Sequence, residues 1–121
     1  MEHFYAWDRI PEEGHRSQNI VTDRITRKFV VGKNQMACWF TFKDVMTMKP
    51  HRHPHEQISL IQRGRFRFRV AGQEREVGPG DVVLIPGDVE HGYDVLEPGS
   101  VDLEIFSPIR EDFLAPHQLM S

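Results

Sequence analysis

Apolar and polar residues alternate with a period of two along much of the chain, which is typical of β-strands with one buried face. The alternation is clearest in residues 36–43, 65–70 and 100–106. Residues 57–62 and 74–77 are further strand candidates, and we interpret the apolar run 81–85 as a buried strand. Apart from a turn expected near residues 110–114, no long stretch has the period of a helix.

Glycine and proline residues separate these strand candidates. Gly32, Gly64, Pro86 and Pro108 each follow an apolar stretch, and the strands recur about every 8–12 residues. Short strands at that spacing are typical of a β-sandwich or a β-barrel. The sequence therefore predicts an all-β fold.

The first 27 residues differ from the rest of the chain because they are polar and mixed. We expect residues 1–27 to form an arm, with one short strand near Ile20–Val21, that packs on the barrel or on a partner subunit. Residues 28–121 are expected to form a single barrel domain. The arm carries Phe4, Tyr5 and Trp7, which a small domain cannot easily bury alone, so we expect a homodimer in which the N-terminal strands can be exchanged.

The composition narrows the class of protein. A chain of 121 residues with 39% hydrophobic and 27% charged residues fits one globular domain. A formal charge of -3 argues against a nucleic-acid-binding module. No apolar stretch approaches the roughly 18–20 residues of a membrane helix, and the N-terminus lacks the apolar segment of a secretory signal. Because a lone Cys38 excludes an intramolecular disulfide, we expect a cytoplasmic location.

The histidines carry the candidate chemistry. His51 and His53 lie two residues apart, so both rings point to the same side of an extended chain. Gln57 has the same parity and can join them if the chain turns at Pro54, and His91 follows a second turn. Three imidazoles and one amide oxygen suit a divalent transition metal, with one or two positions left for water or substrate. The simpler alternative is a set of exposed loop histidines.

The same residues fit two motifs by which the chain resembles a small single-domain cupin. The first motif reads His-x-His, three or four residues, Glu or Gln, six residues, Gly, and residues 51–64 have this spacing. The second reads Gly, five residues, Pro-x-Gly, two residues, His, and residues 80–91 match it, except that Asp88 replaces the second Gly. The resemblance implies a jelly-roll-like β-barrel, also called a double-stranded β-helix, with a metal between two antiparallel sheets near one mouth.

The cupin resemblance also implies the metal ligands, which are His51, His53, Gln57 and His91. Zn, Ni, Mn, Fe, Co and Cu all remain candidates for the ion. Gln57 stands where many cupins have Glu, and a neutral amide leaves the ion more positive than a carboxylate would. We therefore expect the ion to be held less tightly and to polarise a bound oxygen more strongly.

A narrower resemblance is to the KdgF-type cupins of pectin and alginate breakdown, on residues 51–57 and 106–113. Those proteins open the ring of 4,5-unsaturated monouronates to a linear keto sugar. The resemblance implies a cavity lined by an acid, a Phe and an Arg, which fall on Glu104, Phe106 and Arg110, although the family has Asp at the first position. Glu104 would move a proton, Arg110 would pair with the uronate carboxylate, and Phe106 would form an apolar wall.

Alternatives stay open for several of these residues. Glu104 can instead lie on the outer face of the last strand, and Arg110 can form a surface ion pair with Glu111 or Asp112. We expect His55, which shares the ligands' parity, to line the substrate entrance. For the whole protein the alternatives are a dioxygenase cupin that uses Fe(II) and a non-enzymatic cupin that binds or senses a small ligand. A purely apolar cavity would favour the dioxygenase, and closed metal coordination would favour binding or a structural role.

Overall fold

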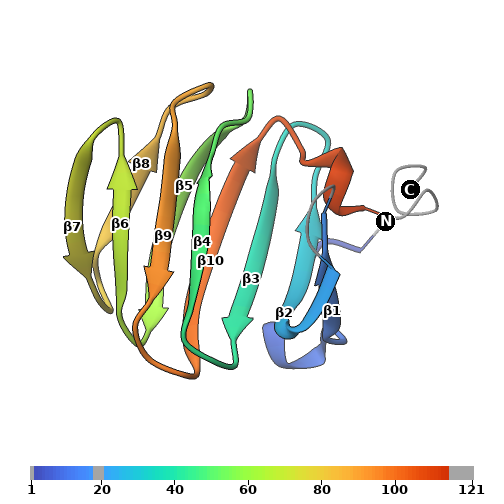
Figure 1. Cartoon of the computed structure of the whole chain (residues 1–121). Coiled ribbons are helices and arrows are strands. Elements are labelled where there is room, and N and C mark those ends of the chain that lie inside the picture. Colours follow the sequence, from blue (N-terminus) through green and yellow to red (C-terminus); the bar gives the residue numbers. More distant parts are fainter. Residues whose placement is uncertain (1, 18–20, 115–121) are drawn as a thin grey trace.

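The computed structural model describes residues 2–17 and 21–114 and consists of two facing antiparallel β-sheets (Figure 1). The larger sheet has the strand order β1-β2-β3-β10-β5-β8, and the smaller has the order β4-β9-β6-β7. The strands are β1 (Glu13–Arg16), β2 (Val21–Val31), β3 (Met36–Phe42), β4 (Met46–His51), β5 (Glu56–Arg63), β6 (Phe66–Val70), β7 (Gln73–Val77), β8 (Val82–Ile85), β9 (His91–Val95) and β10 (Ser100–Ser107). The all-β prediction is confirmed.

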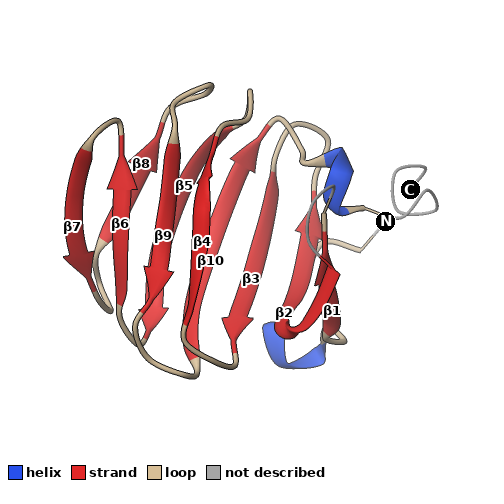
Figure 2. Cartoon of the chain, in the orientation of Figure 1, coloured by secondary structure: helices blue, strands red, loops and turns tan. Residues whose placement is uncertain are grey.

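Helical structure within the described residues is confined to two 3₁₀ turns, η1 (Trp7–Arg9) and η2 (Glu111–Phe113), coloured blue in Figure 2. The turn expected near residues 110–114 corresponds to η2. In the described part of the chain, no helix has the length and apolar character needed to cross a membrane.

The core lies between the sheets. Alternate residues of β3, from Met36 to Phe42, are buried, as the period of two predicts. Phe42, Phe66 and Tyr93 pack edge to face across the two sheets, with ring centroids 5.5 to 5.9 Å apart. Cys38 is fully buried, and burial raises the pKa of its thiol well above the ordinary value. This apolar cluster holds the two sheets together.

The N-terminal region is joined to the barrel more closely than the sequence indicated. β2 runs from Val21 to Val31, so the boundary expected between residues 27 and 28 falls inside a strand. β1 pairs with β2 and extends the larger sheet beyond the smaller one (Figure 1). The inward position 27 on β2 is a buried arginine, which hid the apolar alternation. Ile20, part of the expected short strand, lies outside the described residues.

The interpretation of residues 81–85 as a buried strand is wrong. Among the described strands, β8 is the edge strand of the larger sheet, with β5 as its single partner. Val82 and Leu84 are 60% and 59% exposed, whereas Ile85 is fully buried. A run of apolar residues predicts a strand, but it does not show whether the strand lies in the centre or at the edge of a sheet.

The strand directions bring the conspicuous polar residues to one end of the barrel. β4 and β10 end at this mouth, and β5 and β9 begin there, because neighbouring strands are antiparallel. His51 is therefore directly opposite His91 in the smaller sheet, and Gln57 is opposite Phe106 in the larger one. The apolar cluster of Phe42, Phe66 and Tyr93 fills the space between the sheets further in.

Candidate metal centre

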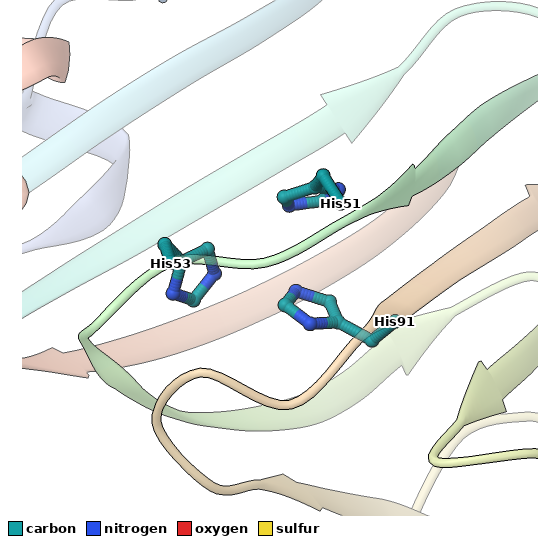
Figure 3. Close-up of side chains that lie close together, drawn as sticks. All are labelled: His51, His53 and His91. Atoms are coloured by element: carbon teal, nitrogen blue, oxygen red, sulfur yellow. The ribbon is translucent and has the colours of Figure 1, made fainter.

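Three histidines converge at this mouth (Figure 3). His51 is the last residue of β4, His53 lies in the connection to β5, and His91 is the first residue of β9. One ring nitrogen from each lies within 4.8 Å of the others. The centroid of the His91 ring is 4.4 Å from that of His51 and 4.7 Å from that of His53. Ring nitrogens this close together are candidates to share one metal ion.

Backbone carbonyls determine which nitrogen of each ring is free. The Nδ1 atoms of His51, His53 and His91 lie 3.2, 3.0 and 2.9 Å from the carbonyl oxygens of Lys49, His55 and Val89. A carbonyl only accepts hydrogen bonds, so each Nδ1 carries the hydrogen and each Nε2 keeps its lone pair. The Nε2 atoms of His53 and His91 are buried and have no hydrogen-bond partner within residues 2–17 and 21–114. Metal-binding histidines use this arrangement, so the donor set fits an ion.

Burial keeps two of these rings neutral. It lowers the pKa of His53 to about 4, and the positive Arg110 and the neighbouring His91 and His51 add to the decrease. Burial also lowers the pKa of His91. Neutral imidazole is the form that binds a metal, so these ligands have no proton to lose at neutral pH.

Gln57 lines the same cavity from the beginning of β5. Its side chain is buried, and its Nε2 donates a hydrogen bond to Ser59 Oγ at 3.0 Å. This contact leaves the amide oxygen, Oε1, available as a ligand. Together with three imidazole nitrogens it makes a donor set suited to a divalent first-row transition metal.

A cavity of about 1100 Å³ opens beside the histidines. Its lining includes the charged residues Lys33, Lys49, Glu104, Arg110 and Asp112. A cavity with this lining is not the purely apolar pocket that would favour a dioxygenase. Four donors, His51, His53, His91 and Gln57, would leave a transition-metal ion one or two positions for another ligand, and the cavity provides space for it beside them.

Glu104 faces this cavity and does not lie on the outer face of β10. Burial raises the pKa of Glu104 well above its ordinary value, and the neighbouring Asp102 carboxylate raises it further. Burial raises the pKa of Asp102 to about 6. Asp102 is fully buried, and side-chain hydrogen bonds with Glu104 and Ser59 lower its pKa in part. Glu104 therefore holds a proton more readily than an exposed glutamate does, which suits a group that transfers protons.

Arg110 combines two arrangements that the sequence left as alternatives. Its guanidinium forms a two-pronged pair with Asp112, at 2.9 Å from Nε and 2.8 Å from Nη2. The side chain is nevertheless buried on the cavity wall, with its guanidinium carbon 4.1 Å from the ring centroid of Phe113. Asp112 uses one edge of the fork, which leaves the hydrogens on Nη1 for a bound anion.

The structure places Phe106 differently from the sequence expectation. Phe106 is only 1% exposed and does not line the cavity. Its ring packs against His53 at 5.8 Å and against Phe113 at 5.7 Å. It supports the ligand His53 from behind and forms no wall for a sugar, because β10 turns its last inward side chain toward the core. His55 does line the cavity, with its ring 5.4 Å from that of His53, but lies outside the three-histidine cluster.

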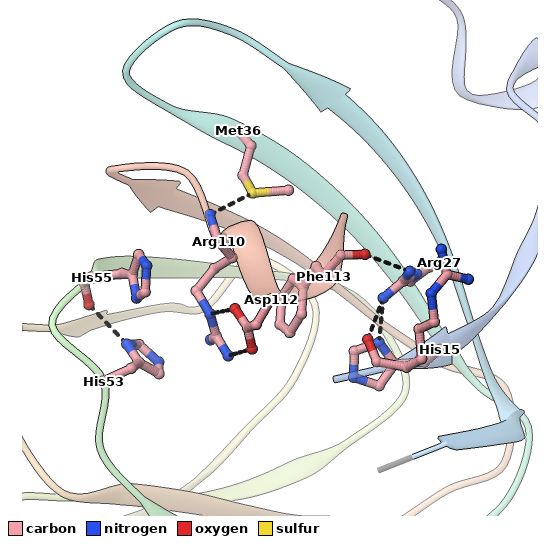
Figure 4. A network of polar contacts seen from close by, with 9 residues as sticks. His15, Arg27, Met36, His53, His55, Arg110, Asp112 and Phe113 are labelled. Atoms are coloured by element: carbon pink, nitrogen blue, oxygen red, sulfur yellow. Dashed lines mark hydrogen bonds and ion pairs between the residues drawn. The ribbon is translucent and has the colours of Figure 1, made fainter. Parts of the chain in front are cut away.

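Sequence reasoning missed three residues of this region: His15, Arg27 and Asp102. His15 lines the cavity from β1, and Arg27 is fully buried beside it (Figure 4). No pattern marks His15, because β1 has four residues and only His15 among them is buried. The parity of β10 could have identified Asp102, which shares the inward face with Glu104 and Phe106.

Comparisons with known proteins agree on one family. The cupin domain model matches residues 40–106. The chain is 35% identical over 117 residues to the pectin degradation protein KdgF of Dickeya dadantii (strain 3937), with 94% of this chain and 100% of that protein covered. The solved structure of KdgF from Halomonas sp. is similar with a TM-score of 0.81 and 29% identity, covering 94% of this chain and 100% of that one. An RmlC-like cupin from Shewanella frigidimarina NCIMB 400 has a TM-score of 0.80 and 27% identity, covering 94% of this chain and 97% of that one.

Proposed function

The chain belongs to the cupin family, and we propose that it is a metal-dependent enzyme that opens the ring of 4,5-unsaturated monouronates. The observation that carries the proposal is the set of side chains that meet at the cavity end of the barrel. Three convergent histidines lie beside a cavity that also holds a buried carboxyl group with a raised pKa, Glu104, and a buried guanidinium, Arg110. The name of the relative from Dickeya dadantii, a pectin degradation protein, supports a uronate as the substrate class.

His51, His53, His91 and Gln57 would hold the divalent ion. When bound there, the ion supplies Lewis acidity that stabilises negative charge on an oxygen of the sugar. The Nδ1–H contacts with backbone carbonyls orient the three rings and leave each Nε2 free as a ligand.

Glu104 supplies the proton transfer that ring opening needs. As the bond between the anomeric carbon and the ring oxygen breaks, its electron pair passes to the ring oxygen and the anomeric hydroxyl loses its proton. The ring oxygen is attached to the C4=C5 alkene, so the first product is an enolate that needs one proton to become the keto sugar. The Glu104 carboxylate would accept the proton of the anomeric hydroxyl as the ring opens and then return it to C4 of the enolate, so the reaction is an isomerisation without net gain or loss of protons.

Arg110 binds the substrate carboxylate. Its Nη1 hydrogens remain available beside the Asp112 pair, and a guanidinium suits a carboxylate in geometry and charge. Lys33 and Lys49 add positive charge to the cavity lining, which favours the entry of an anionic sugar. We also expect the enzyme to act in the cytoplasm, because its single cysteine, Cys38, is buried and free.

The test is the loss of ultraviolet absorbance when the conjugated alkene of an unsaturated monouronate is consumed. We expect turnover by the wild-type protein, loss of turnover after chelation, and recovery when one divalent ion is restored. The variant Glu104→Gln should retain the metal and lose at least 100-fold in kcat. An absorbance that falls no faster than in buffer, with a metal-loaded and folded protein, would contradict the proposal.

A further inference from the structure

His15 is an unexpected polar residue on the cavity wall. It belongs to β1, the outermost strand of the larger sheet, and its side chain is buried and lines the cavity. The ring packs edge to face against Phe40 at 5.2 Å and against Phe113 at 5.1 Å. These two aromatic contacts fix the plane of the imidazole.

The tautomer of His15 is the opposite of that in the three clustered histidines. Arg27 Nη1 lies 3.2 Å from His15 Nδ1. An arginine guanidinium only donates, so Nδ1 is the acceptor and the ring hydrogen sits on Nε2. Burial lowers the pKa of His15 to about 4, and the charge of Arg27 lowers it further, so the ring stays neutral at neutral pH. His15 is thus a donor through Nε2–H, not a lone pair for a metal.

Arg27 is itself held rigidly. Its side chain is fully buried and donates to the backbone oxygens of Arg16 and Phe113, both at 2.6 Å, and to the Glu13 carboxylate at 3.1 Å. These contacts connect β1, β2 and η2, so the position and tautomer of His15 are fixed before any ligand arrives. Figure 4 shows His53 and His55 on one side of the Arg110–Asp112 pair and His15 with Arg27 on the other.

Among the described residues, the bond from Arg27 is the only hydrogen bond of the His15 side chain. We propose that His15 donates a hydrogen bond from Nε2–H to an oxygen of the bound sugar acid, at the side of the cavity away from the histidine cluster. This inference rests on the proposed function, since it names a second anchor for the same substrate. It makes His15 a specificity-determining residue: a sugar acid that reaches from the histidine cluster past Arg110 to His15 is preferred over a shorter acid.

The test compares His15→Phe with two other variants in the unsaturated-monouronate assay. His15→Phe keeps the aromatic packing and removes the N–H, His15→Gln restores a donor, and His3→Phe is the matched control because His3 is exposed. We expect His15→Phe to raise KM about tenfold with kcat within about twofold of wild type, because a ground-state contact is lost. Metal content should not change, His15→Gln should recover part of the affinity, and His3→Phe should match wild type.

Nitrogen-15 NMR of the wild-type protein provides a readout that needs no variant. We expect the His15 ring to show hydrogen on Nε2 and not on Nδ1, and the Nε2 signal to shift when the sugar acid is added. An unchanged KM in folded His15→Phe, or a His15 ring protonated on Nδ1, would overturn the inference while leaving the ring-opening activity intact. If the wild type turns over no unsaturated uronate, the proposed function itself fails, and the inference fails with it.

Discussion

The buried arginine offers a sharp prediction about what holds the N-terminal strands and the C-terminal turn on the barrel. Replacing Arg27 with methionine keeps a long side chain but removes every donor. Four contacts disappear, of which those to His15 Nδ1 and to the Phe113 carbonyl oxygen are fully buried. These two acceptors would be left without partners.

The magnitude follows from these two acceptors. A buried acceptor that loses its donor costs about 1–3 kcal/mol, and the loss of the buried charge relieves part of the desolvation penalty of the guanidinium. We therefore expect Arg27→Met to lower the free energy of unfolding by about 3 kcal/mol. The unfolding entropy of a domain of this size is about 0.25 kcal/mol per kelvin, so the melting temperature should fall by about 12 °C.

Thermal unfolding followed by circular dichroism measures this effect, and the same strand offers a control. Arg24 pairs with Asp44 at 3.1 Å, but the two side chains are 55% and 54% exposed. Such a surface pair contributes less than about 1 kcal/mol, so Arg24→Met should lower the melting temperature by less than about 4 °C. Equal melting temperatures for Arg27→Met and Arg24→Met would refute the role assigned to Arg27.

Three further predictions follow from the remaining features. Glu104→Gln should leave the melting temperature unchanged or higher, because burial and the neighbouring Asp102 disfavour the charged form of the native carboxyl group and raise its pKa. A fall of more than about 4 °C would contradict this account of Glu104. The pKa of His15 is about 4 in the folded protein against 6.5 when unfolded, so protonation favours unfolding. The contribution of neutral His15 to the free energy of unfolding is complete above pH 6.5 and falls by about 3 kcal/mol as the pH drops to 4. Urea unfolding at several pH values should therefore show that the free energy of unfolding decreases less at acid pH in His15→Phe than in wild type. Finally, Phe4 and Tyr5 are 88% and 56% exposed, and we propose that a homodimer covers them. Light scattering should give a mass of twice the 14.1 kDa of one chain, and the double variant Phe4→Ser with Tyr5→Ser should be monomeric. A monomeric wild type would contradict the dimer.

The strands and the histidine cluster could be predicted because both depend on local parity. A period of two assigns each residue of β3 or β6 to a face, and residues two apart, such as His51 and His53, necessarily approach the same point. The turns at Gly64 and Pro86 then fix where the next strand begins. Short-range rules of this kind need no knowledge of the distant partner.

The remaining features depend on contacts between segments far apart in the chain. β8 is the last strand in the order of the larger sheet, so only one of its sides is paired among the described strands. The apolar sequence of β8 cannot reveal this position. The buried state of Arg27 requires the carbonyl of Phe113, 86 residues away, and His15 acquires its role only when β1 pairs with β2. Phe106 has the expected parity, yet its neighbours His53 and Phe113 decide that it supports the site from behind.

The most direct measurement is the metal content of the protein, purified without chelator and without a histidine-rich tag, alongside the double variant His53→Ala with His91→Ala. The Nε2 atoms of these residues are buried and find no hydrogen-bond partner in the part of the chain that the structure describes. We predict about one divalent transition metal per chain in the wild type and none in the double variant, with both folded by circular dichroism. A wild type that is metal-free and cannot be reloaded with any divalent ion would contradict the metal centre.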